Sequence, residues 1–161
     1  MPIRARVALA LAAGEHSLPV LNELAAVHTA ASVALADGWH WAAGEVIGPR
    51  DLYAHVHRLL SLEPNLAGDE RAKSALYAVV DALYYTTWQA QKSAASESER
   101  RLPNDMAEIG EDSLTAALAH ATEATQSADW QDSTIRRLAA ASLDMGPDDL
   151  GAPVQRTLIS G

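Results

Sequence analysis

Apolar residues recur at intervals of three and four along most of this chain, and no segment alternates apolar and polar residues for long. One such series is Val20, Leu24, Val27, Ala31 and Leu35. A second is Ala72, Leu76, Val79, Val80, Leu83 and Thr87. This spacing places the apolar side chains on one face of an α-helix, whereas a strand needs a period of two. The pattern therefore predicts an all-α fold, a helical bundle of about six or seven helices.

Chain length favours a single helical domain over residues 1–161, since 161 residues can bury one independent core. Hydrophobic residues make up 48% of the sequence, many of them alanine, and phenylalanine is absent. Small residues with high helix propensity favour helices that pack closely. After Gly146-Pro147 the sequence loses its helical period, so we expect an irregular C-terminal tail over about residues 146–161.

Glycine and proline mark the expected ends of the N-terminal helices. We expect a first helix from Ile3 to about Ala13, with Gly14 as its stop. Ser17 and Pro19 are typical of a helix start, and helical spacing continues from there to Val46. Unbroken, that helix would be about 40 Å long, as wide as the whole domain. We therefore expect an interruption at His28-Thr29 or at Asp37-Gly38.

Similar signals place the remaining helices. Gly48-Pro49 starts a helix, because proline is tolerated in the first turn. Asp69 is expected to cap a long helix that reaches about Ala95. The polar segment that follows is expected to be a loop, Asp112 to open another helix, and a final helix to span about residues 129–143.

The N-terminus combines Arg4 and Arg6 with a short apolar run, as a secretory signal would. The run Val7–Ala13 is at the lower length limit for such a signal. We therefore interpret it as a retained, amphipathic first helix and expect a cytoplasmic protein. No stretch is apolar for long enough to span a membrane.

Charge and cysteine content exclude several functions. The chain has no cysteine, which removes disulfides, thiolate metal sites and cysteine nucleophiles. Acidic residues outnumber basic ones by 21 to 12, for a formal net charge of −9. Such a chain repels nucleic acid and anionic lipid, and it attracts basic partners. We therefore expect no nucleic-acid or membrane partner.

Acidic residues concentrate between Arg101 and Arg136, where no lysine or arginine occurs. This segment contains Asp105, Glu108, Glu111, Asp112, Glu123, Asp129 and Asp132. A charged run of this kind is commonly a solvated face that maintains solubility. The alternative is a docking surface for a cationic protein, to which Trp130 would add an aromatic contact.

Two tryptophans flank a histidine in the sequence Trp39-His40-Trp41. In a helix successive residues turn by about 100°, so the two indole rings point to nearly opposite sides. Both rings are buried only if this helix is central. Otherwise one ring, for which we consider Trp41, is available as a binding anchor. His40 is expected to face the flank of the helix or solvent.

Asp37 and Asp81 lie within apolar, helical stretches. Around Asp81, Tyr77, Tyr84 and Trp88 share one helical face opposite the aliphatic one. One interpretation is a structural polar network between helices, and the other is a face that binds a ligand or partner.

Motifs for common chemistries are missing from the sequence. It contains no pair of Glu-x-x-His motifs, no His-Glu-x-x-His, no P-loop and no Gly-x-Ser-x-Gly elbow. We therefore expect no catalytic residue, metal or cofactor. One alternative remains open, a small helical enzyme or metal-binding bundle that uses Asp37, His40, His55 and Asp81, with His28 or His57 as further ligands.

The order of features resembles a known family. The features are "ADGWHW", a Gly-Pro-Arg-Asp-Leu-Tyr turn into a helix, "ALYAVVDALYYTTWQAQ", "PNDMAEIGEDSLTAAL" and "DWQDSTIRRL". Over about residues 18–140 this resembles the all-helical immunity proteins of bacterial polymorphic toxin and contact-dependent inhibition systems. The resemblance implies a non-catalytic, cytoplasmic protein that binds a cognate toxin domain and blocks it.

We hypothesise that the partner is a basic toxin and that it contacts the acidic segment, with Trp130 and Trp41 as aromatic contacts. A homodimer or homo-oligomeric scaffold is the other alternative, and it would cover the face of Tyr77, Tyr84 and Trp88.

Overall fold

The computed structural model describes residues 1–94, 110 and 112–160, and within them the chain forms six α-helices and no strand. The predicted all-α class is confirmed. The helices are α1 (Ile3–Ser17), α2 (Ala25–Ala42), α3 (Pro49–Ser61), α4 (Glu70–Ser93), α7 (Ser113–Thr125) and α8 (Asp129–Ala140).

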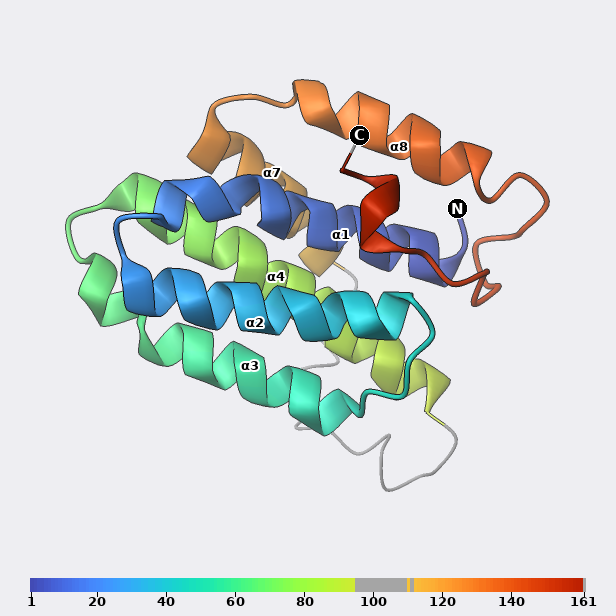
Figure 1. Cartoon of the computed structure of the whole chain (residues 1–161), viewed down its shortest axis with the longest axis horizontal. Helices are drawn as coiled ribbons and strands as arrows, with labels where there is room; N and C mark the ends of the chain where they lie inside the picture. Colours follow the sequence, from blue (N-terminus) through green and yellow to red (C-terminus); the bar gives the residue numbers. More distant parts are fainter. Residues whose placement is uncertain (95–109, 111, 161) are drawn as a thin grey trace.

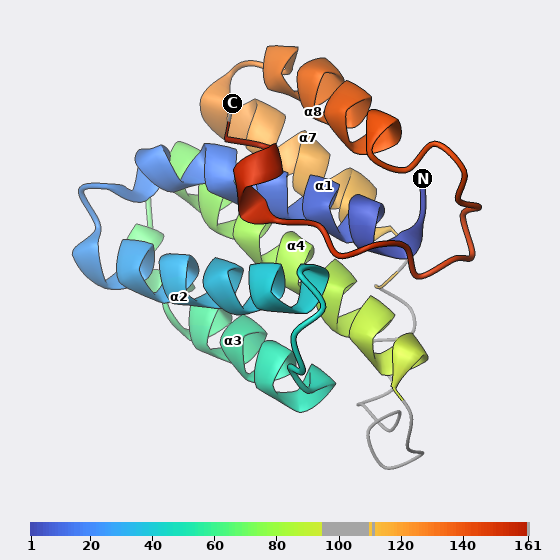
Figure 2. The same ribbon diagram turned by 45° about the vertical axis from the view of Figure 1, so that its right-hand side comes forward.

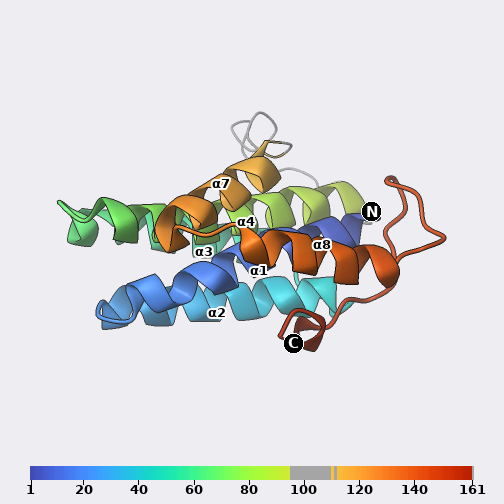
Figure 3. The same cartoon turned by 90° about the horizontal axis from the view of Figure 1, so that it is seen from above.

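The six helices form two layers (Figures 1 and 3). One layer contains α8, α1 and α2 side by side, and the other contains α7, α4 and α3 in the same order. Helices α1 and α4 are central in their layers and pack against each other. The core is therefore the space around these two helices, and the other four cover it.

Helix α1 is buried on nearly all sides. Every residue from Val7 to Gly14 is buried, as are Ala5 and Ser17. The prediction of an amphipathic first helix is wrong, because α1 contacts α2, α4, α7 and α8, and from Val7 to Gly14 no side of the helix is left for solvent. Its alanines and leucines surround the helix, and the small side chains let four neighbours approach.

Two glycines bring α1 and α2 into close contact. A methyl group on Gly14 would lie 2.7 Å from Leu35 Cδ2, and one on Gly38 would lie 2.5 Å from Leu11 Cδ2. Each leucine thus occupies the space above the glycine of the opposite helix. Gly14 does not stop α1 and Gly38 does not interrupt α2, so both expectations are wrong. These glycines serve close approach rather than helix termination.

The interruption occurs earlier, between Leu18 and Leu24. Residues Leu18–Leu21 form a 3₁₀ turn that contains Pro19, and α2 then runs unbroken from Ala25. Proline has no N–H and its ring clashes with the preceding turn. It therefore separates α1 from α2 instead of starting a helix that continues to Val46.

The later helix starts agree with the expected signals. Pro49 occupies the first turn of α3. The side chain of Asp69 accepts a hydrogen bond from the Ala72 N–H at 3.0 Å, as an N-cap does at the start of α4. Asp112 precedes α7, and Asp129 is the first residue of α8. None of the described helices is both long enough and apolar enough to cross a bilayer.

Residues 141–160 form a mostly non-helical segment, here called the C-terminal strap, that crosses α1 and the end of α2 (Figure 2). Ile3 N–H donates to Asp149 O at 2.8 Å, and Val154 N–H donates to Ala42 O at 2.9 Å. Arg4 adds a bond from Nη1 to Gly151 O at 3.1 Å. These bonds attach the strap to both helices.

The contact between α1 and α2 can be tested with Gly38→Ala. On an open helix this change would stabilise, because glycine has lower helix propensity than alanine. Here the methyl group would overlap Leu11, so we expect a loss of about 1–3 kcal/mol in the free energy of unfolding. Chemical denaturation measures it.

Combining Gly38→Ala with Leu11→Val provides the control. Removing the Cδ atoms of Leu11 should relieve the overlap, so the two changes together should destabilise less than the sum of their separate effects. Gly14→Ala faces Leu35 instead and should show no such relief with Leu11→Val. If Leu11→Val reduced the destabilisation caused by Gly14→Ala as much as that caused by Gly38→Ala, the proposed packing would be contradicted.

Candidate functional site

Trp39 and Trp41 both belong to the core. Their exposed fractions are 3% and 8%, because α2 is covered by α1, α3 and α4. Trp39 Nε1–H donates to Glu15 Oε1 at 3.0 Å. His40 is exposed, with Nδ1 at 3.6 Å from Asp37 Oδ1. Trp41, which was predicted as a partner contact, therefore offers little surface to a partner, and the core accounts for both tryptophans.

Asp37 connects α2 to α3. Its Oδ2 lies 2.6 Å from His55 Nε2, a hydrogen-bond distance. An ionised carboxylate can only accept, so the imidazole N–H donates. The side chain of Asp37 is 34% exposed, which leaves it accessible at one side.

Asp81 connects α4 to α7 in the same way. Its Oδ2 lies 2.7 Å from His120 Nδ1, and the carboxylate is 15% exposed. Burial raises the pKa of Asp81 above its ordinary value, while the hydrogen bond and charge of His120 act in the opposite direction. The carboxylate therefore lies where its charge is poorly solvated and where a further cation would stabilise it.

The side of α4 around Asp81 is its least buried side between Ala72 and Ala90. Between Ala72 and Ala90, all residues of α4 are buried except five. These five are only partly buried, and they are Lys73, Tyr77, Asp81, Tyr84 and Trp88. Their spacing of three and four puts them in one line along the helix, here called the α4 stripe. The line faces away from α1, which packs on the buried side of α4.

Side chains of α3 and of the turn after it extend this stripe. The Tyr53 ring packs edge-on against His57, with centroids 4.5 Å apart, and lies 6.5 Å from the Tyr84 ring. Tyr77 O–H donates to Glu63. This bond, with burial and nearby carboxylates, raises the pKa of Tyr77 to about 12.

On the other side, α7 contributes His120, whose ring centroid is 5.5 Å from that of Tyr77. We call the whole set the aromatic face, and it comprises the α4 stripe with Tyr53, His57, Glu63 and His120. Sequence spacing along one helix groups only Tyr77, Asp81, Tyr84 and Trp88. Apart from Lys73, the other members come from different elements. His120, for example, is 39 residues from Asp81, and no local pattern relates the two.

The described residues among the predicted acidic contacts lie at two separate positions, before α7 and at the start of α8. Asp105, Glu108 and Glu111 lie outside the described residues. Asp112 precedes α7 and Asp129 starts α8, so the length of α7, about 20 Å at 1.5 Å per residue, separates them. Both are exposed, and within the described residues neither forms an ion pair.

Trp130 is partly buried against α1. Its ring stacks on His16 with centroids 4.4 Å apart and an interplanar angle of 21°. Burial lowers the pKa of His16, and the neighbouring Glu15 partly offsets this effect. Trp130 thus joins α8 to α1 while part of its surface stays accessible.

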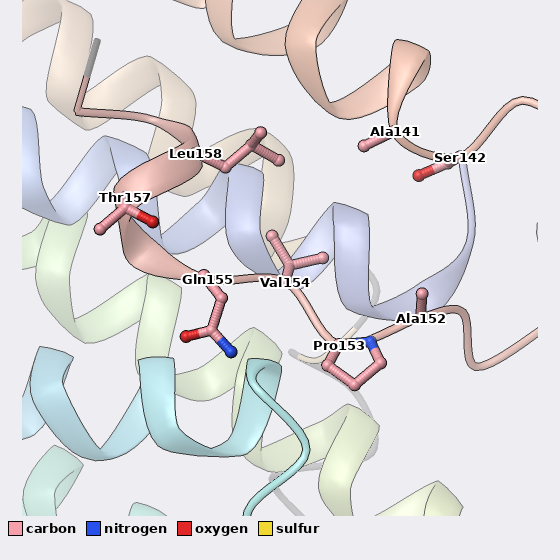
Figure 4. A pocket seen from close by; sticks show the side chains of 8 residues that line it. All are labelled: Ala141, Ser142, Ala152, Pro153, Val154, Gln155, Thr157 and Leu158. Atoms are coloured by element: carbon pink, nitrogen blue, oxygen red, sulfur yellow. The ribbon is translucent and has the colours of Figure 1, made fainter.

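A cavity of about 430 Å³ lies between the first residues of the C-terminal strap, which follow α8 directly, and its later residues 152–158 (Figure 4). The side chains of Ala141, Val154 and Leu158 point toward one another across it, and its lining contains no charged residue. Such a lining supplies neither an acid nor a base. Among the described residues there is also no group of three metal-ligating side chains.

Asp81→Asn tests the burial of the Asp81 carboxylate. Because burial raises its pKa above 3.8, the folded state holds the proton more tightly than the unfolded state. That stabilisation is present below pH 3.8 and is lost as the pH rises through the folded pKa. Asparagine lacks this titration. We therefore expect the variant to gain stability relative to the wild type over the interval from about pH 4 upward, as measured by urea unfolding.

An exposed carboxylate in the strap provides the comparison. Asp144→Asn should change the free energy of unfolding by less than about 0.5 kcal/mol, as surface substitutions usually do. If Asp81→Asn instead lost stability relative to the wild type over that interval, the bond to His120 would outweigh burial.

Comparison with known proteins identifies one family. No similar protein was found among curated proteins or among solved structures. The family model described as Immunity protein Imm6 matches residues 5–125, a range that reaches from the first turn of α1 to the end of α7 and covers well over half of the chain. This agrees with the resemblance seen in the sequence, and the chain therefore belongs to the Imm6 family of immunity proteins.

Proposed function

We propose that this protein binds a cognate bacterial toxin domain and neutralises it by occupying its surface, without catalysing a reaction. The observation that supports this most is the family match, which extends over both layers of the bundle. Immunity proteins as a family imply a toxin partner. Neutralisation by binding requires a stable, complementary surface and no reacting group, and a rigid helical bundle with a well-packed core provides such a surface.

The charge of the chain supports a basic toxin as that partner. The formal net charge is −9. Asp112, Asp129 and Asp132 are exposed, and in the part of the chain that the structure describes they have no ion-pair partner. Unpaired carboxylates attract a cationic protein over several ångströms and accelerate its capture. The cytoplasmic location and a possible homodimer remain predictions.

Co-expression with the toxin domain encoded by the neighbouring gene tests this function. Cells should survive induction of that domain only when this chain is present, and native mass spectrometry should detect a complex of the two intact proteins. An unrelated toxin domain should still kill. Survival without a complex, or chemical alteration of the toxin, would contradict neutralisation by binding.

The proposed electrostatic attraction predicts a specific kinetic effect. Replacing Asp112, Asp129 and Asp132 with asparagine should lower the association rate constant about tenfold at low ionic strength, and should weaken its dependence on salt. The dissociation rate constant should change little, because exposed charges contribute mainly to encounter. Surface plasmon resonance at several salt concentrations measures both constants.

A matched variant removes the same number of charges elsewhere. Glu23→Gln, Glu45→Gln and Asp144→Asn alter three exposed carboxylates outside α7 and α8. If this triple variant slows association as much as the first, net charge alone acts and the α7–α8 carboxylates have no special role.

A further inference from the structure

We infer that the aromatic face is the surface that holds the toxin, and that it receives a segment bearing a lysine or arginine side chain. This inference rests on the proposed function and adds to it the place of contact and the chemistry of the partner. The acidic residues of α7 and α8 would then govern encounter, and the aromatic face would govern how long the complex lasts.

Composition distinguishes this surface from the rest of the molecule. Three of the four tyrosines of the chain, Tyr53, Tyr77 and Tyr84, lie here with Trp88, and all four rings are only partly buried. Elsewhere Trp39, Trp41 and Tyr85 are in the core. Tyrosine and tryptophan are the residues that most often dominate binding energy at protein interfaces. Tyr53, Tyr84 and Trp88 pack against the edge of the core, and part of each side chain stays accessible to a partner.

The rings are held in place before any partner arrives. Tyr53 is fixed between His57 and Tyr84, and Tyr77 is fixed by Glu63 and His120. When a partner binds, these side chains lose little further conformational entropy, because their rotamers are already restricted. The aromatic face is therefore preorganised, as expected of a surface selected for tight binding.

In the part of the chain that the structure describes, the two layers leave this surface partly accessible. The C-terminal strap lies over α1 and α2, on the side opposite α4 and α7 (Figure 3). A partner that approached from the strap side would meet a surface already covered by the chain itself. On the other side, the α4 stripe keeps its large side chains partly accessible.

The charges of the aromatic face select a cation. Glu63 and Asp81 place two carboxylates among the rings, and the faces of tyrosine and tryptophan rings also attract cations. Trp88 already shows this geometry, with Lys92 Nζ at 4.3 Å from its ring centroid. Lys73, the cation within the stripe, is paired with Glu70 at 3.2 Å. A lysine or arginine of the toxin would meet Tyr77, Tyr84 and Asp81 in the same way.

The same charges disfavour a second copy of this chain as the occupant. A symmetric dimer through this surface would bring Asp81 and Glu63 of one copy against the same residues of the other. Like charges that face each other in an interface oppose association. A basic toxin is therefore the better match.

Tyr84→Ala tests the inference directly. With the toxin domain of the neighbouring gene immobilised, we expect the dissociation rate constant to rise about tenfold or more, while the association rate constant stays within about threefold of the wild type. Tyr84→Phe keeps the ring and should dissociate nearly as slowly as the wild type. Circular dichroism and thermal unfolding establish that each variant is folded.

Val33→Ala is the matched control, because Val33 is a 53% exposed apolar residue on α2. It should leave both rate constants unchanged. The inference would be overturned if Tyr84→Ala dissociated as slowly as the wild type, or if Val33→Ala raised the dissociation rate constant as much as Tyr84→Ala does. The proposed function would stand in both cases. A dimer of this chain that Tyr84→Ala abolishes would overturn the inference as well. If the wild type does not bind the toxin domain, the proposed function itself fails.

Discussion

The interlocked contact of α1 with α2 determines how the rest of the molecule is arranged. Leu11 lies over Gly38 and Leu35 lies over Gly14, so the two backbones approach more closely than ordinary side chains allow. This leaves the opposite sides of α1 for α4, α7 and α8. Both layers of the bundle are thus built from one helix whose small residues accept neighbours in every direction.

Local signals in the sequence predicted where the helices start better than they predicted how the helices pack. Pro49 and Asp69 act through groups one to three residues away, so the starts of α3 and α4 could be predicted. Gly14 and Gly38 were misinterpreted because glycine suits both a helix end and a close approach, and only the opposing leucine decides between them. The partner of Asp81 was not predictable, because His120 belongs to a helix 39 residues away.

The two sides of the bundle differ in what they offer to another protein. The C-terminal strap, which lies outside the matched range 5–125, covers α1 and α2 with the chain's own backbone. The opposite side exposes rings and carboxylates held by neighbours, and it lies within that range. The proposed aromatic face therefore lies in the part of the chain that the family model matches.

The strap also determines how this chain reaches its native state. Its hydrogen bond between Ile3 and Asp149 joins residues 146 positions apart in sequence, since 149 minus 3 is 146. Helix α1 meanwhile requires α4, α7 and α8 to bury its alanines. A fragment that lacks α7 and α8 therefore contains an incomplete core. Such contacts form only after long-range loop closure, so they slow folding relative to a bundle that is held by local contacts alone.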